Sequence, residues 1–174
     1  GASNAREAYD EASYCISLIR DYQITYPVAF DWELDSDYDS VTEACETFCN
    51  VISSYGYQPM VYSNRNRWYN NFDGEKIASK YKVWMAAYFG KFYYDSVRWT
   101  YGDDLPNFRY HYDMWQYSSR CYVDGISGQV DVDIAFFGYA NYHVDTKDAV
   151  LTVTNKEIKR TYGDGIGRLT EELN

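Results

Sequence analysis

The sequence predicts an α/β protein built on a parallel sheet or barrel. Helical and strand patterns alternate along the first half of the chain, which is typical of that class. The predicted strands are apolar on both faces, as parallel strands are when helices cover them. The 174 residues are enough for one domain with a hydrophobic core, and a hydrophobic fraction of 46% excludes a disordered chain.

Two helices and a strand are predicted in the first third of the chain. Residues 3–22 keep one apolar face at helical spacing, and Ser3 is expected to cap this helix. The apolar run at 26–34 predicts a strand. Residues 40–55 again repeat apolar side chains at helical spacing, and Gly56 is expected to end that helix.

Strands dominate the middle of the chain. Strands predicted at 58–64 and 82–89 flank a shorter helix at 66–79, and a long loop is expected over 90–108. The last two predicted strands have no clear helix between them, a spacing that a regular eight-fold barrel would not show. These two strands are residues 112–118 and 128–137.

The final segment, residues 143–174, is more polar than the rest and contains no Trp or Phe. Two interpretations stay open for it. It is either a linker that leads into a further module or a C-terminal helix packed on the domain. We therefore place the main domain at residues 1–142.

Charge and composition argue against several classes of function. A net charge of −10 and a pI near 4.6 argue against binding to nucleic acid or anionic lipid, because both are negatively charged. No apolar stretch approaches the ~20 residues that cross a bilayer, and no signal peptide is recognisable, so no membrane insertion is expected. The 21 Tyr, 5 Trp and 8 Phe build cores, and Tyr and Trp also line sugar-binding clefts.

Metal-dependent and histidine-dependent chemistry is poorly supported. The chain has two isolated histidines, His111 and His143, and no zinc-ligand spacing, so we expect no metal and no cofactor. Cys45 and Cys49 lie four residues apart on a predicted helix, and buried thiols are favoured over a bridge. The four cysteines are Cys15, Cys45, Cys49 and Cys121.

Two carboxylates lie where the apolar run "YPVAFDWELD" ends. Asp31 and Glu33 are two residues apart, so in a strand they project to the same side while Trp32 projects to the other. Their Cβ atoms would be ~6–7 Å apart, a separation suited to acid/base work on a glycosidic bond. Repulsion between them is expected to keep one carboxyl protonated near neutral pH. Parallel sheets place active sites at this end of their strands.

The alternative is an acidic strand end or a helix cap without catalytic function. Three further carboxylates before the second helix fit that alternative: Asp35, Asp37 and Asp39. A second acidic pair, Asp131 and Asp133, occupies a strand that otherwise reads Val, Val, Ile. A charged residue in such a strand needs a partner or a function.

Four stretches of the sequence follow one another in the order of the motifs of one known protein family. "YPVAFDWE" is similar to the family's D-x-E strand, and "YGYQPMVYSN" to the next helix end and strand. "KVWMAAYF" is similar to its W-x-A-x-Y strand, and "MWQYSSRCYVDGISGQVDVDIAFF" to its closing segment. Through these stretches, over about residues 4 to 139, the chain resembles glycoside hydrolase family 25, the lysozymes or N-acetylmuramidases.

The resemblance implies an irregular TIM-like (β/α) barrel with extra strands at its end. It also implies an enzyme, a glycoside hydrolase that cuts the β-1,4 bond between N-acetylmuramic acid and N-acetylglucosamine in peptidoglycan. Its partners are then peptidoglycan glycan strands. Its place is extracellular or at the cell wall, as a secreted autolysin or a phage endolysin.

The resemblance also implies roles for individual residues. Glu33 would be the general acid, Asp31 would orient the substrate's N-acetyl group, and Asp131 would assist in the same cleft. Four more residues match strand-end positions that line the sugar cleft: Tyr62, Tyr88, Trp115 and Gln116. Packing in the barrel interior is the alternative for these four, above all for Trp115.

One departure from the family is large. The family opens with a strand reading roughly D-V-S-x-x-Q, and two β/α units follow before the helix that matches residues 3–22. None of these is present, so residues 1–142 are expected to be the C-terminal two-thirds of a muramidase barrel that lacks its first strands. Two alternatives for function stay open, a non-catalytic glycan-binding remnant and a chitinase-like glycosidase.

Overall fold

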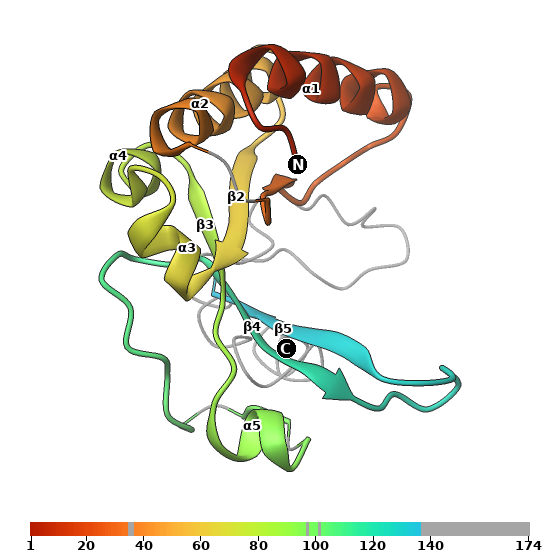
Figure 1. The fold of residues 1–174 in the computed structure, drawn as a ribbon. Helices are drawn as coiled ribbons and strands as arrows, with labels where there is room; N and C mark the ends of the chain where they lie inside the picture. Colours follow the sequence, from red (N-terminus) through yellow and green to blue (C-terminus); the bar gives the residue numbers. More distant parts are fainter. Residues whose placement is uncertain (35–36, 97, 101, 137–174) are drawn as a thin grey trace, which may run out of the picture. The chain divides into compact units, whose positions relative to one another are not determined.

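The computed structural model describes residues 1–34, 37–96, 98–100 and 102–136 (Figure 1). The chain divides into two compact units, and each is treated by itself. Unit 1 comprises residues 1–86 and 108–112, and unit 2 comprises residues 87–107 together with the described residues from 113 onward. The segment 143–174, with His143, lies outside the described residues.

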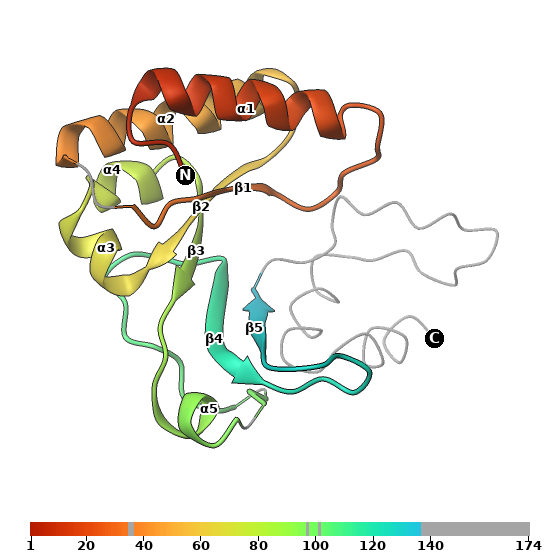
Figure 2. The same cartoon turned by 45° about the vertical axis from the view of Figure 1, so that its right-hand side comes forward.

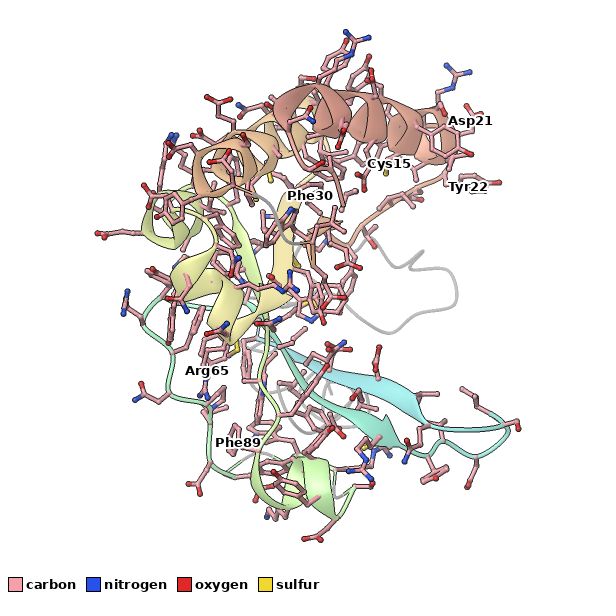
Figure 3. The ribbon with its side chains drawn as sticks, viewed as in Figure 1. Cys15, Asp21, Tyr22, Phe30, Arg65 and Phe89 are labelled. Atoms are coloured by element: carbon pink, nitrogen blue, oxygen red, sulfur yellow. The ribbon has the colours of Figure 1, made fainter. Side chains whose placement is uncertain are left out.

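Unit 1 is a three-stranded parallel sheet with helices on one face. Phe30, Val61 and Val83 are in register across the three strands and are fully buried. Figures 1 and 2 show α1 and α2 side by side over this face. Phe30 points toward the helices (Figure 3), and its ring stacks on Phe48 of α2 with centroids 4.8 Å apart. The elements are α1 (Ala5–Ile19), β1 (Val28–Asp31), α2 (Tyr38–Ser54), β2 (Pro59–Asn64) and β3 (Lys82–Ala86).

The long helices begin at side-chain caps. The predicted cap Ser3 is wrong by one residue, because the Asn4 side chain accepts from the Glu7 amide at 3.0 Å. Ser3 instead donates to the Glu7 carboxylate at 2.6 Å, which completes a reciprocal cap. Asp37 caps α2, while Asp35 lies outside the described residues. Gly56 follows α2 with φ +83°, as expected for a glycine that ends a helix.

The single helix predicted at 66–79 is wrong. The segment forms two short helices, α3 (Arg65–Asn70) and α4 (Gly74–Ala78). The Asp73 side chain accepts from the Lys76 amide at 3.0 Å and so starts a second helix. The backbone at Gly74 lies so close to that of Trp68 that a Cβ at position 74 would be 2.3 Å from the Trp68 carbonyl oxygen. The apolar spacing of the segment did not reveal this break.

Unit 2 contains an antiparallel strand pair and a short helix. β4 (Met114–Cys121) and β5 (Val130–Ala135) pair with irregularities in their register. This pairing agrees with the expected strands that follow one another without a helix between them (Figure 2). The helix α5 (Gly90–Tyr94) occupies the start of the segment predicted as a loop, so that prediction was wrong there.

The buried thiols expected on the second helix are present. Cys45 and Cys49 are fully buried on α2 and form no disulfide. Burial raises the pKa of both thiols far above its ordinary value. Among the described residues, no helix is long and apolar enough to cross a membrane.

We expect the isolated 174-residue chain to self-associate. The backbone amides of Val28 and Trp32 donate to carbonyls on the β2 side. Amides alternate between the two edges of a strand, so those of Ala29 and Asp31 point to the opposite edge of β1. The described residues place no strand along that edge. An unpaired strand edge favours pairing with another chain. Leu18 of α1 is 54% exposed and adds apolar surface.

Size-exclusion chromatography with light scattering measures this association. Leu18→Lys should shift the chain toward monomer without changing its helix content. A monodisperse parent monomer with a sharp, cooperative melt would contradict the expectation.

Candidate active site

The structure ends β1 at Asp31, so the strand predicted to reach residue 34 is too long. One further ladder bond forms, from the Trp32 amide to the Tyr62 carbonyl at 3.0 Å. The alternation of faces nevertheless continues past the strand. Phe30 and Trp32 are fully buried, whereas Asp31 and Glu33 are exposed. Both carboxylates are therefore accessible, and Glu33 lies on the loop that follows the strand.

Trp32 anchors the backbone between the two carboxylates. Its indole Nε1 donates to the Ala2 carbonyl at 3.2 Å, and its own carbonyl accepts from Ser63 Oγ at 2.7 Å. Its ring meets Phe72 edge-on, with centroids 5.8 Å apart. A Cβ on Gly1 would lie 2.5 Å from the Asp31 carbonyl oxygen, so the N-terminal residues pack closely on the same strand end. The buried indole thus fixes the chain from which Asp31 and Glu33 project.

Asp31 heads a row of side chains across the sheet of unit 1. Tyr62 is in register beside Asp31, and Trp84 is in register beside Tyr62. This row lies on the face opposite the helices, because it alternates with the buried Phe30 row. The rings of Tyr62 and Trp84 meet edge-on at 4.8 Å. The sequence did not single out Trp84, because Val83, Trp84 and Met85 form a continuous apolar run, and only the structure shows that Val83 and Met85 are fully buried while Trp84 is not.

The structure brings together two of the predicted residues of unit 2. The Tyr88 hydroxyl donates to Gln116 Oε1, and Tyr88 stacks on Tyr93 with centroids 5.1 Å apart and planes 5° apart. Tyr88 keeps 39% of its surface exposed, whereas Gln116 is 5% exposed. The hydrogen bond therefore holds an accessible aromatic ring against a nearly buried amide.

Trp115 lies in the core of unit 2. Its side chain has no exposed surface, and its indole Nε1 donates to the Ala87 carbonyl at 2.9 Å. Its ring stacks on that of Phe89 (Figure 3), with centroids 5.5 Å apart, and meets the ring of Phe92 edge-on, with centroids 5.8 Å apart. The structure therefore gives Trp115 the packing environment that was the alternative for it.

Asp131 is exposed on β5. Its neighbour on the same strand face, Asp133, is directly opposite Gln116 in the strand register. Asp131 therefore shares a strand face with the amide that Tyr88 contacts. Asp31, Glu33 and Tyr62 belong to unit 1, while the other predicted residues belong to unit 2.

No group of three or more His, Cys, Asp or Glu side chains that could hold a metal ion occurs within the described residues. The acidic side chains that are accessible at the end of β1 are instead arranged as a pair, Asp31 and Glu33. Such a pair is suited to proton transfer and charge stabilisation.

A model of the glycosyl hydrolases of family 25 matches residues 2–126. The chain belongs to this family. The family 25 chain is 28% identical over 171 residues to a lysozyme of Streptococcus phage Cp-7, covering 93% of this chain and 45% of that protein. It spans less than half the length of the curated relatives that it matches.

Solved structures show the same fold class. The CTP1L endolysin superposes with a TM-score of 0.61 at 26% identity, over 78% of this chain and 44% of that chain. The modular Cpl-1 endolysin superposes with a TM-score of 0.50 at 28% identity, over 68% of this chain and 34% of that chain; that structure is described as a complex with a peptidoglycan analogue. The expected class, a TIM-like α/β barrel present in part, is confirmed.

Proposed function

We propose that the protein hydrolyses the β-1,4 bond between N-acetylmuramic acid and N-acetylglucosamine in peptidoglycan. One observation carries the proposal. In a family 25 chain, two exposed carboxylates, Asp31 and Glu33, project from the carboxyl end of a parallel strand that a buried Trp holds in place. This end of the strand is where α/β barrels perform their chemistry.

The two carboxylates take different roles. Glu33 gives its proton to the glycosidic oxygen as the bond from that oxygen to the anomeric carbon breaks. Water then adds to the anomeric carbon and returns a proton to Glu33, so the acid is regenerated. Asp31 orients and stabilises the substrate's N-acetyl group, in a substrate-assisted route or beside it.

The residues of unit 2 supply binding surface. Tyr88 offers an exposed ring for a sugar, and the hydrogen bond to Gln116 fixes its orientation. Asp131 is exposed on the strand face that Gln116 shares, and it assists through its charge. A cleft role for Tyr62 and for Trp115 stays a prediction.

The relatives support the choice of substrate and location. Lysozymes of Streptococcus phages Cp-1 and Cp-7 match most of this chain, and the Cpl-1 endolysin was crystallised with a peptidoglycan analogue. We infer that the partner of this protein is the peptidoglycan glycan strand. Its site of action is then the cell wall, as an autolysin or a phage endolysin.

Clearing of purified cell walls tests the proposal. The complete protein should lower the turbidity of a cell-wall suspension and release reducing ends. Binding to cell walls without release would favour a glycan-binding module. Reducing ends from chitin but not from peptidoglycan would favour a chitinase-like enzyme.

Two matched substitutions in unit 2 separate packing from binding. Trp115→Ala should lower the free energy of unfolding by ~3–5 kcal/mol, because it empties a core position. Tyr88→Phe should lower the melting temperature much less, because the ring stays and only the hydroxyl, with its hydrogen bond to Gln116, is lost. It should lower kcat/KM by about 2- to 10-fold, the equivalent of one hydrogen bond.

Thermal melts and cell-wall kinetics on both variants give the answer. If Tyr88→Phe kept full kcat/KM, the hydrogen bond to Gln116 would have no part in binding. If Trp115→Ala folded stably but lost affinity for glycan, Trp115 would belong to the cleft after all.

A further inference from the structure

We propose that Arg67 is a positioning residue that fixes the loop carrying Glu33. Arg67 lies on α3, more than thirty residues away in the sequence, and neither the motifs nor the family resemblance pointed to it. The inference rests on the proposed function, in which Glu33 is the general acid. It adds a residue that acts on the acid through its two neighbours in the chain, the indole ring of Trp32 and the backbone carbonyl of Leu34.

Glu33 needs such support because the sheet ends before it. The last ladder bond runs from the Trp32 amide to the Tyr62 carbonyl at 3.0 Å. The strand register therefore fixes the residue before Glu33 but not Glu33 itself. A general acid must point at one oxygen of the substrate, so the backbone after the strand has to be held by other contacts.

Arg67 makes contacts on both sides of Glu33. Its Nη1 donates to the Leu34 carbonyl at 2.5 Å, and its guanidinium carbon lies 5.5 Å from the centre of the Trp32 ring. Leu34 is 41% exposed, and within the part of the chain that the structure describes this is the hydrogen bond that holds it. One side chain thus contacts the buried indole before the acid and the backbone carbonyl after it.

Hydrogen bonds hold the backbone of Arg67 in place. It lies in the first turn of α3, where its amide donates to the cap Asn64 Oδ1 at 3.1 Å and its carbonyl accepts from the Asn71 amide at 2.9 Å. Asn64 is the last residue of β2, the strand that pairs with β1. The base of the Arg67 side chain is therefore held to the same end of the sheet as the carboxylates.

The chemistry of these contacts favours arginine. A planar guanidinium can lie over an indole face and donate to a carbonyl in the same conformation. A lysine ammonium carries the same charge, but it is a compact, strongly hydrated point and lacks the planar fork. Lysine at position 67 should therefore keep the local charge and lose the simultaneous contact with Trp32 and Leu34.

The test compares Arg67→Lys and Arg67→Met in the complete protein, with kcat and KM measured separately on soluble glycan strands from peptidoglycan. We expect kcat to fall by about 10- to 100-fold in Arg67→Met, because a misplacement of about 1 Å is enough for such a loss. KM should stay within about 2-fold of the parent, since the substrate contacts are unchanged. Arg67→Lys should recover only part of kcat.

A double-mutant cycle with Glu33→Gln distinguishes an effect through Glu33 from a general loss of structure. The quantity compared is the loss of kcat caused by Arg67→Met with and without the Glu33 carboxyl group. If Arg67 acts through Glu33, adding Arg67→Met to Glu33→Gln should cause no further loss of kcat. Arg6→Met is the control for removing one arginine, because Arg6 is an exposed residue of α1 that pairs with Asp10. It should leave kcat and KM at the parent values.

Several results would overturn the inference. These are a kcat unchanged in both Arg67 variants, a rise in KM with unchanged kcat, and losses that add fully to those of Glu33→Gln. If Arg67→Met fails to fold, the same cycle run with Arg67→Lys decides the question. Full activity of Glu33→Gln would remove the proposed function itself, whereas an inactive Glu33→Gln with a fully active Arg67→Met would remove only the role of Arg67.

Discussion

Glu33→Gln is expected to lower kcat on peptidoglycan by about 10²–10⁴-fold, the usual contribution of general acid catalysis. The amide has nearly the same shape as the carboxyl group, but it has no proton to give to the glycosidic oxygen. Glu33 is exposed beyond the end of β1 and is no part of the core. The melting temperature of the variant should therefore equal that of the parent.

Steady-state release of reducing ends, together with a thermal melt, measures both effects in the complete protein. Glu43→Gln is a matched control, since Glu43 is an exposed residue of α2 and its loss should change neither quantity. KM should change little in Glu33→Gln, because the substrate is still held by its other contacts. Near-normal clearing of cell walls by a folded Glu33→Gln variant would take the role of general acid away from Glu33.

The arrangement of unit 1 could be predicted from the sequence because its elements follow simple periodicities. Apolar side chains at helical spacing placed α2 to within two residues, and Gly56 ended it as expected. The breaks were harder to predict. The division between α3 and α4 depends on the cap formed by Asp73 and on the close approach at Gly74, and neither changes the apolar spacing.

The site could be predicted only in part. The alternation of a strand gave the pair Asp31 and Glu33, with Trp32 on the buried side. The contact of Arg67 with Leu34 could not be predicted, because it depends on where the first turn of α3 lies after β2. Spacing along one strand is local information, whereas contacts over thirty residues depend on the packed sheet.

Asp31→Asn is the second substitution expected to have a large effect. Asp31 shares the exposed side of the strand end with Glu33, and its charge is proposed to hold and stabilise the N-acetyl group of the substrate. Removing such a preorganised group commonly costs about 10²–10³-fold in kcat. Asn keeps the size of the side chain, so kcat should fall far more than any loss of stability would explain.

Asp37 provides the contrasting case, a carboxylate that serves folding. Hydrogen bonds from Ser40, and from the Asp39 amide, hold the pKa of Asp37 below its ordinary value. A carboxyl group whose pKa is lower in the folded state stabilises the fold above its unfolded pKa, and this stabilisation is lost as the pH falls through the folded pKa. Asp37→Ala should therefore be destabilising at neutral pH, and the difference from the parent should shrink in acid.

The two substitutions should therefore change different quantities, once kcat is expressed per folded molecule: Asp31→Asn the kcat, and Asp37→Ala the stability. Asp31→Asn should lose activity at every pH with a melting temperature close to that of the parent. Asp37→Ala should keep the parent kcat while it melts earlier near neutral pH. Urea unfolding at several pH values and initial rates on cell walls give both quantities. Equal losses of kcat in the two variants would mean that Asp31 also acts through the fold, and the carboxylate pair would then reduce to Glu33 alone.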